Sequence, residues 1–144
     1  MSVSYRIGVV GFSRSQFDHA AAEAALSSSL DQLLARARSG AVELVSGLTN
    51  QGVPKLAYQL AVARGLRTVG LSARQALRVR AGVFPVDERI IVGQRFGDES
   101  AAFIAYIDAL IRIGGGPQSR REVELFKDKL TACDRDPAEP SART

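Results

Sequence analysis

The sequence predicts an α/β protein with three layers, in which helices cover both faces of a parallel sheet of at least five strands. Short β-branched runs alternate with stretches of helical character from residue 5 to about residue 131. Strands that are separated by helices in this way pair in parallel and are buried on both faces. The loops that follow the runs are polar or contain glycine, as is typical of βα connections.

The first three elements are predicted from composition and from their end signals. Residues 5–11 (YRIGVVG) form a β-branched run that ends in glycine, which predicts a buried strand. Residues 19–39 are rich in alanine and leucine, and Asp18 can cap the helix that they predict. Gly40 is placed to end this helix, and residues 41–47 (AVELVSG) predict the second strand.

The middle of the chain repeats the alternation. Pro54 suits the first turn of a helix, which is predicted over residues 54–64. Residues 66–71 (LRTVGL) predict the third strand, and Ser72 is expected to cap a short helix over about 73–80.

Two further strands and a helix follow. Residues 89–93 (RIIVG) predict the fourth strand and residues 109–113 (ALIRI) the fifth. A helix is expected between them at about 99–107, capped by Asp98 or Ser100.

The last element and the tail complete the organisation. Three glycines at 114–116 and Pro117 lead into a helix predicted over about 119–131. The chain is expected to form a single domain over 1–133, followed by a polar, proline-bearing and disordered tail at 134–144.

Composition limits the class of protein. The 144 residues suffice for one domain with a single core, and 46% hydrophobic with 24% charged residues is the balance of a soluble globular protein. No apolar run approaches the roughly 20 residues that span a membrane. A secretory signal is not visible at the N-terminus, so a cytoplasmic location and no membrane association are expected.

The number of cysteines and the net charge limit which kinds of binding site the chain can contain. Cys133 is the single cysteine, which excludes an internal disulfide and fits a reducing compartment. With one cysteine and one histidine, no metal site is expected, and no cofactor is predicted. The formal charge of +4, from 19 basic and 15 acidic residues, is too modest to imply nucleic-acid binding by itself.

Ligands of parallel α/β proteins bind beyond the carboxyl ends of the strands, where the strand order reverses. The loop after the first strand is therefore a candidate ligand-binding loop. Gly11 permits a close backbone approach, Ser13 offers a hydroxyl group and Arg14 a positive charge, just before a helix N-terminus that attracts anions. An ordinary βα turn explains the same residues.

The loop over residues 46–52 (SGLTNQG) has the composition of a phosphate cradle. Ser46, Gly47, Thr49 and Gln51 are small or polar and precede a helix. Many polar βα loops share this composition, and the glycine spacing and lysine of a P-loop are absent.

The third loop offers successive backbone N–H groups at Gly114, Gly115 and Gly116, which can converge on an anion. Ser119 can cap the following helix or hold a phosphate. Glu122 lies three residues later, which is the spacing of a capping box and also suits a general acid or base aimed at a ligand. The residues leave both interpretations open.

Residues 108–124 (DALIRIGGGPQSRREVE) resemble the signature of the Lonely Guy (LOG) family, an aspartate and an apolar strand followed by Pro-Gly-Gly-x-Gly-Thr-x-x-Glu. Residues 46–65 look like the second glycine-rich loop and helix of the same superfamily, and also like a stretch of the DNA-processing protein A branch. Residues 8–15 are similar to its first phosphate loop. Five positions fall on those of the signature: Asp108, Gly115, Gly116, Ser119 and Glu122.

The resemblance implies the SLOG superfamily, whose Rossmann-like fold binds nucleotides and nucleotide derivatives. LOG members are phosphoribohydrolases that cleave the N-glycosidic bond of nucleoside 5′-monophosphates with a glutamate of the glycine motif and an arginine on the preceding helix. By this resemblance Glu122 is the candidate catalytic residue. The resemblance and the apolar stretch at 101–110 both predict a homodimer.

The chain departs from the family pattern at three positions. Gly114 stands where the family has proline, and Gln118 where it has its third glycine. Glu99 stands where the catalytic arginine is expected, and Arg95 is the nearest arginine. The sequence therefore predicts binding of a nucleotide or nucleotide-sugar derivative. A phosphoribohydrolase is the first alternative, and a DNA-associated protein of the DNA-processing type is the second.

Overall fold

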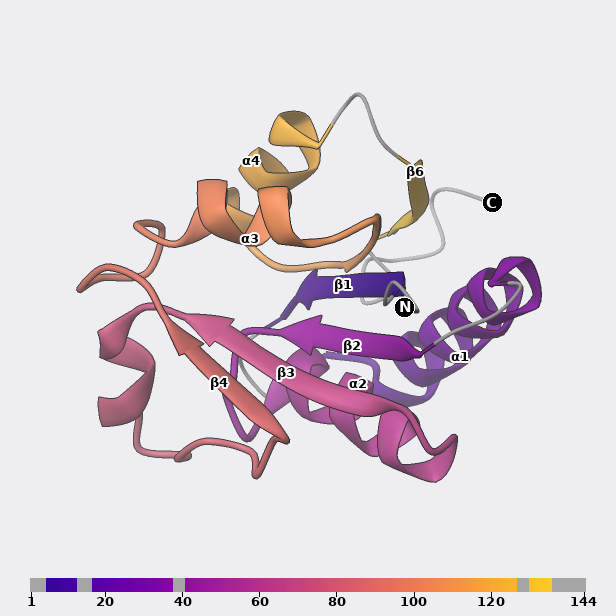
Figure 1. Cartoon of the computed structure of the whole chain (residues 1–144), viewed down its shortest axis with the longest axis horizontal. Helices are drawn as coiled ribbons and strands as arrows, with labels where there is room; N and C mark the ends of the chain where they lie inside the picture. Colours follow the sequence, from indigo (N-terminus) through magenta and orange to yellow (C-terminus); the bar gives the residue numbers. More distant parts are fainter. Residues whose placement is uncertain (1–4, 13–16, 38–40, 127–129, 136–144) are drawn as a thin grey trace.

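The computed structural model describes residues 5–12, 17–37, 41–126 and 130–135 (Figure 1). Six parallel strands form one sheet in the order β4-β3-β2-β1-β5-β6. The predicted parallel sheet of at least five strands is confirmed. The strands are β1 (Tyr5–Gly11), β2 (Val42–Ser46), β3 (Arg67–Ser72), β4 (Glu88–Ile91), β5 (Ala109–Ile113) and β6 (Leu130–Arg135).

Helices cover both faces of this sheet, which gives the three layers that the sequence predicts. In Figure 1, α1 and α2 lie on one side of the strands, and α3 and α4 lie on the other. Each face has its own buried apolar cluster, one that joins β1 and β5 to α1 and α2 and one that joins β2, β3 and β5 to α3. The helices are α1 (His19–Arg36), α2 (Gly52–Ala63), α3 (Ser100–Tyr106) and α4 (Pro117–Leu125), with a 3₁₀ helix η1 (Arg74–Arg78).

The strand order reverses between β1 and β5. The chain builds β1 to β4 toward one edge of the sheet, and then returns to place β5 on the other side of β1, where Gly11 pairs with Ile113. Such a reversal opens a crevice at the carboxyl ends of the two strands. The loops after β1 and β5 meet there.

The helix starts confirm one predicted cap and correct others. Asp18 caps α1, because its Oδ1 accepts the N–H of Ala21 at 3.0 Å. Asp98 does not cap α3; its Oδ2 accepts the N–H groups of Gln94 and Arg95 and holds the preceding turn. Ser100 and Ser72 are not caps either, since α3 and η1 begin without a side-chain cap hydrogen bond.

The end of the chain differs most from the prediction. The helix expected over 119–131 begins earlier, at Pro117, and ends at Leu125. Residues 130–135 form β6 instead, paired in parallel with β5, so a strand enters the first two residues of the predicted tail. Residues 136–144 lie outside the described residues.

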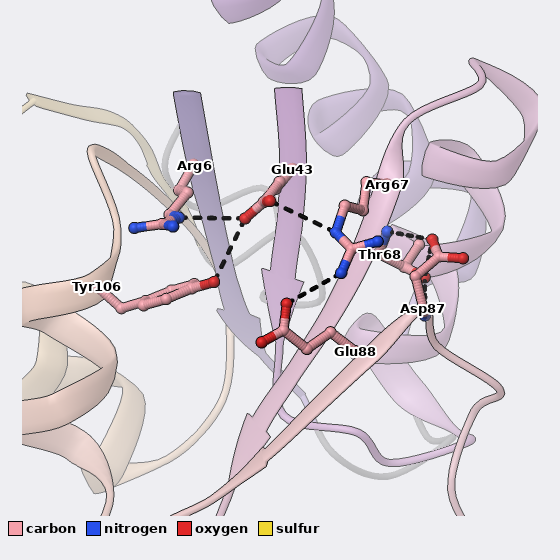
Figure 2. A network of polar contacts seen from close by, with 7 residues as sticks. All are labelled: Arg6, Glu43, Arg67, Thr68, Asp87, Glu88 and Tyr106. Carbon is pink, nitrogen blue, oxygen red and sulfur yellow. Dashed lines mark hydrogen bonds and ion pairs between the residues drawn. The ribbon is translucent and has the colours of Figure 1, made fainter. Parts of the chain in front are cut away.

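A polar network ties together the amino ends of the strands, at the edge opposite the crevice (Figure 2). The buried carboxylate of Glu43 accepts a hydrogen bond from Arg6 Nε at 3.1 Å and lies 3.5 Å from Arg67 Nε. Arg67 also bonds Glu88 at 3.0 Å, and the Arg6 guanidinium stacks 4.0 Å over the Tyr106 ring. These charges neutralise one another across β1 to β4, so the network is structural.

Candidate functional site

A cavity of about 290 Å³ opens at the carboxyl ends of β1, β2 and β3. Its walls come from the loop after β2, the start of α2, the residues before and within α3, and the start of α4. The volume lies near the lower end of the roughly 300–1,000 Å³ range of ligand pockets. The cavity therefore lies at the carboxyl edge of the sheet, where the sequence predicts a shared site.

The predicted site residues divide between the cavity wall and other places. Gln51, Gly114 and Gly115 are not part of the wall, and Ser13 and Arg14 lie outside the described residues. The predicted residues on the wall are Gly11, Ser46, Gly47, Thr49, Gly116, Ser119 and Glu122.

Two helices begin beside the cavity without a side-chain cap. Helix α2 starts at Gly52, whose φ of 69° lies in the left-handed region, and the N–H of Val53 donates to the carbonyl of Phe12 at 2.7 Å. Helix α4 starts after Gly116. The positive ends of both helix dipoles favour an anionic group in the cavity.

The loop between β2 and α2 is held in a strained conformation. Leu48 has a φ of 74°, which is rare for a residue with a large side chain. Its N–H donates to the Tyr58 hydroxyl at 3.2 Å, and that hydroxyl donates to the carbonyl of Val69 at 3.1 Å. Burial raises the pKa of Tyr58 well above its usual value, so the hydroxyl keeps its proton. The arrangement presents Gly47 and Thr49 to the cavity.

The three glycines of the loop between β5 and α4, residues 114–116, differ in what surrounds them. Gly114 (φ 69°) packs against the Phe12 ring, and Gly115 (φ 93°) packs against the backbone of Gly11 and the Ser119 hydroxyl. A Cβ atom would collide at either position. Gly116 borders the cavity, and a Cβ atom there would meet open space.

The capping box that the sequence allows for Ser119 and Glu122 is not formed. The helix starts two residues before Ser119, whose hydroxyl donates to the carbonyls of Gly114 and Gly116 at 3.0 and 3.1 Å. Ser119 therefore braces the glycine loop. Glu122 therefore takes no part in a helix cap, and it lines the cavity.

Two buried carboxylates, Glu99 and Glu122, lie at the α3–α4 side of the cavity. The amide nitrogen of Gln118 donates to Glu99 Oε2 at 3.0 Å and to Glu122 Oε2 at 3.2 Å. The Ser100 hydroxyl also donates to Glu122 Oε2, at 2.8 Å. Burial raises the pKa of Glu122 above its usual value, and the nearby charge of Glu99 adds to the rise, against the hydrogen bonds from Ser100 and Gln118.

From the sequence alone, Glu99 and Gln118 are departures from a family pattern and are not predicted in the site. They lie 19 positions apart in the chain, so no local spacing joins them. Arg112 was also missed. Its buried side chain donates a hydrogen bond to the carbonyl of Gly114 at 2.9 Å. This bond ties β5 to the glycine loop that follows it. An arginine in the middle of a predicted buried strand was the available signal.

The charged side chains that line the cavity are carboxylates, those of Glu99 and Glu122. Among the described residues, no lysine or arginine lines the cavity, and Arg95 and Arg120 are exposed. The described residues contain no group of three or more His, Cys, Asp or Glu side chains that could hold a metal ion. No helix in the described segments has the length and apolar character to cross a membrane.

Comparison with known proteins identifies the fold. No family model and no curated protein matches the chain. A solved molybdenum cofactor binding protein from Rippkaea orientalis is similar, with a TM-score of 0.70 and 23% identity over 90% of this chain and 75% of that one. A molybdenum cofactor carrier protein from Chlamydomonas reinhardtii has a TM-score of 0.65 and 21% identity over 94% of this chain and 80% of that one. The Rossmann-like fold that the LOG resemblance implies is confirmed.

Proposed function

We propose that this Rossmann-like chain binds a nucleotide or a nucleotide derivative in the cavity at its strand reversal. The observation that carries the proposal is the meeting of the 46–52 loop, the end of β1 and the start of α4 around one cavity, beside two helix N-termini. Backbone N–H groups and hydroxyls, rather than lysine or arginine, would then hold the phosphate. Gly47 and Thr49 are the residues best placed on the wall for that role.

Likeness to carriers supports binding without turnover. The two similar structures are described as a molybdenum cofactor binding protein and a molybdenum cofactor carrier. The molybdenum cofactor is therefore a second candidate ligand for this cavity. Either ligand gives the chain the task of holding a small molecule.

Hydrolysis of nucleoside monophosphates remains the alternative, with Glu122 as the catalytic carboxylate. Glu99 stands where the resemblance places a catalytic arginine, and its carboxylate lies beside Glu122 on the cavity wall. A carboxylate there repels the substrate phosphate that an arginine would attract. Losing one preorganised contact typically lowers the rate about 10²–10³-fold. We therefore favour binding.

The binding test uses the two glycines at which a methyl group enters open space. Gly47→Ala and Gly116→Ala should fold normally, because a Cβ atom at either position meets no protein atom within 4 Å. Each methyl group would project into the ligand volume. We expect nucleoside monophosphates to raise the melting temperature of the native chain, and each variant to weaken binding about tenfold or more, measured by calorimetry.

Three controls sharpen this test. Gln59→Ala, an exposed change on α2, should leave affinity unchanged. Nucleosides without phosphate should bind far more weakly than the monophosphates. Release of free base from AMP, stopped by Glu122→Ala, would replace the binding function by the hydrolytic one, and no binding of any nucleotide would refute the proposal.

A further inference from the structure

A second hollow, a surface groove, lies between η1 and the turn that follows β4. Its lining residues are Gln75, Arg78 and Val79 on the η1 side and Gln94 and Arg95 on the turn side. The two arginines and the two glutamines are exposed, and no acidic residue of the described chain lines the groove. This arginine groove therefore offers guanidinium and amide donors to a ligand from solvent.

The positive charges of the arginine groove are not neutralised within the protein. Neither Arg78 nor Arg95 forms an ion pair in the described part of the chain, where the ion pairs belong to other arginines. Asp98 of the same turn does not line the groove, and its Oδ2 accepts the N–H groups of Gln94 and Arg95. Arg74, exposed on η1, adds a further positive charge nearby. Like charges held around one groove favour an anion between them.

Hydrogen bonds fix the two walls of the arginine groove relative to each other. The N–H of Gln75 donates to the carbonyl of Gln94 at 2.9 Å, and the N–H of Arg74 donates to the carbonyl of Gly93 at 3.1 Å. The N–H of Phe96 donates to Gln75 Oε1 at 3.0 Å, which leaves the amide NH₂ group of Gln75 as a donor. Because the walls are already in place, an anion binds here at a smaller entropic cost.

The arginine groove continues the cavity along the carboxyl edge of the sheet. The cavity covers the ends of β1, β2 and β3, and the groove lies at the ends of β3 and β4, the next strands in the sheet (Figure 1). Phe96 lines the cavity, and Arg95, the residue before it, lines the groove. Phe96 is 40% exposed at this border. A ligand that fills the cavity therefore reaches the groove by passing Phe96.

We propose that the arginine groove is a second phosphate subsite, and that the ligand is a nucleotide derivative with two phosphate groups separated by at least one ribose. This proposal rests on the proposed nucleotide-binding function and specifies the class of ligand. One phosphate lies at the 46–52 loop, and the nucleoside occupies the cavity. The other phosphate lies between Arg78 and Arg95, whose planar guanidinium groups match phosphate oxygens.

The separation of the two phosphates follows from the order of the strands. The 46–52 loop follows β2, whereas the arginine groove lies at the ends of β3 and β4, with the cavity wall at Phe96 on the way. Phosphates joined directly to each other, as in ADP, stay at one end of a ligand and do not occupy both places. A nucleoside 3′,5′-bisphosphate and a 5′-phosphorylated dinucleotide both carry the separated pair, and they differ in reach.

The test compares ligands that differ in the number and position of their phosphates. The probes are AMP, ADP, adenosine 3′,5′-bisphosphate and the 5′-phosphorylated adenosine dinucleotide, with the guanosine series alongside. At least one ligand with separated phosphates should bind about 5–30-fold more tightly than the monophosphate, the range for two exposed charge contacts. ADP should gain less. Calorimetry measures each affinity, and added salt should shrink the gain because it screens exposed charges.

Variants assign the gain to the groove. Arg78→Gln and Arg95→Gln should each remove most of the gain and leave the affinity for AMP and the melting temperature unchanged, since both side chains are exposed. Arg78→Lys should keep only part of it, because lysine keeps the charge and loses the planar fork. Arg36→Gln makes the same change of charge at an exposed position of α1, away from β4 (Figure 1), and should preserve the gain.

The outcomes distinguish this inference from the proposed function. A gain for separated phosphates that both glutamine variants remove supports the inference. Equal affinity for all probes, a gain that survives both variants, or weaker AMP binding by either variant overturns it, while the proposed function stands if Gly47→Ala still weakens AMP binding. A single-stranded oligonucleotide that binds through the two arginines without displacing AMP also overturns it, in favour of a nucleic-acid surface. Failure of every nucleotide to bind overturns both.

Discussion

Glu122 shows at the scale of one residue how a buried carboxylate on the cavity wall lowers stability. Its carboxylate is 4% exposed and its pKa is raised, chiefly because burial penalises the charged form. The folded chain therefore holds the proton of this group more tightly than the unfolded chain does. The stability linked to this group is complete below the unfolded pKa and is lost as pH rises through the folded pKa.

A substitution that removes the charge tests this reasoning. Glu122→Gln should raise the free energy of unfolding at pH 8 by roughly 0.5–2 kcal/mol, a common gain when a functional group is neutralised. The gain should shrink as the pH falls below about 4, because Glu122 is then protonated in both the folded and the unfolded chain. Urea denaturation of both proteins across this range measures the difference.

Glu124→Gln is the control, because Glu124 is exposed on the same helix. Its effect should be small and nearly independent of pH. A Glu122→Gln protein that is less stable than the native chain at pH 8 would contradict the conclusion that ionised Glu122 is strained.

At the scale of elements, Tyr58 connects helix α2 to the loop that precedes it. The hydroxyl accepts from the N–H of Leu48 and donates to Val69 in β3, and it is fully buried. These two hydrogen bonds hold the backbone around Leu48, whose φ is 74°. One hydroxyl thus positions a strained loop that borders the cavity.

Tyr58→Phe should lower the free energy of unfolding by about 1–3 kcal/mol, because it leaves a buried N–H and a carbonyl without their partner. Nucleotide binding should weaken as well, since the loop loses the contact that holds Leu48. Denaturant unfolding and calorimetry measure the two effects.

Tyr106→Phe is a matched control at a half-buried hydroxyl. That hydroxyl makes a longer bond of 3.4 Å to Glu43, which already pairs with Arg6 and Arg67 (Figure 2). Tyr106→Phe should lower the free energy of unfolding by less than Tyr58→Phe does. It should leave the affinity for nucleotides unchanged. Equal losses in the two variants would argue against a special role of Tyr58.

At the scale of the whole molecule, the structure changes the argument for a homodimer. The apolar residues of 101–110 that seemed in excess are largely used within the chain, since Phe103, Ile107 and Leu110 lie in the buried cluster beneath α3 and α4. The outer surface of these helices retains small residues, Ala101 and Ala105, and Leu125, which is 48% exposed. A dimer interface, if formed by these helices, uses this surface.

We expect a dimeric mass in light scattering at micromolar concentration. Leu125→Glu should shift it to that of a monomer, because a charge would be buried without a partner. Val62→Glu, at an exposed position of α2 on the other face of the sheet, should leave the mass unchanged. A monomer of the native chain would exclude the homodimer.

The sequence by itself determined the alternation of strands and helices, the Asp18 cap and the edge of the sheet where the loops meet. These features depend on residues close together in the chain, on periodicity, end signals and the rule that ligands bind at the carboxyl ends of parallel strands. Only the tertiary structure decided that Leu130–Arg135 forms a sixth strand, because pairing with β5 supplies its hydrogen bonds. It also decided that Gln118 joins Glu99 to Glu122, because that contact spans two helices which meet only when both pack on one face of the sheet.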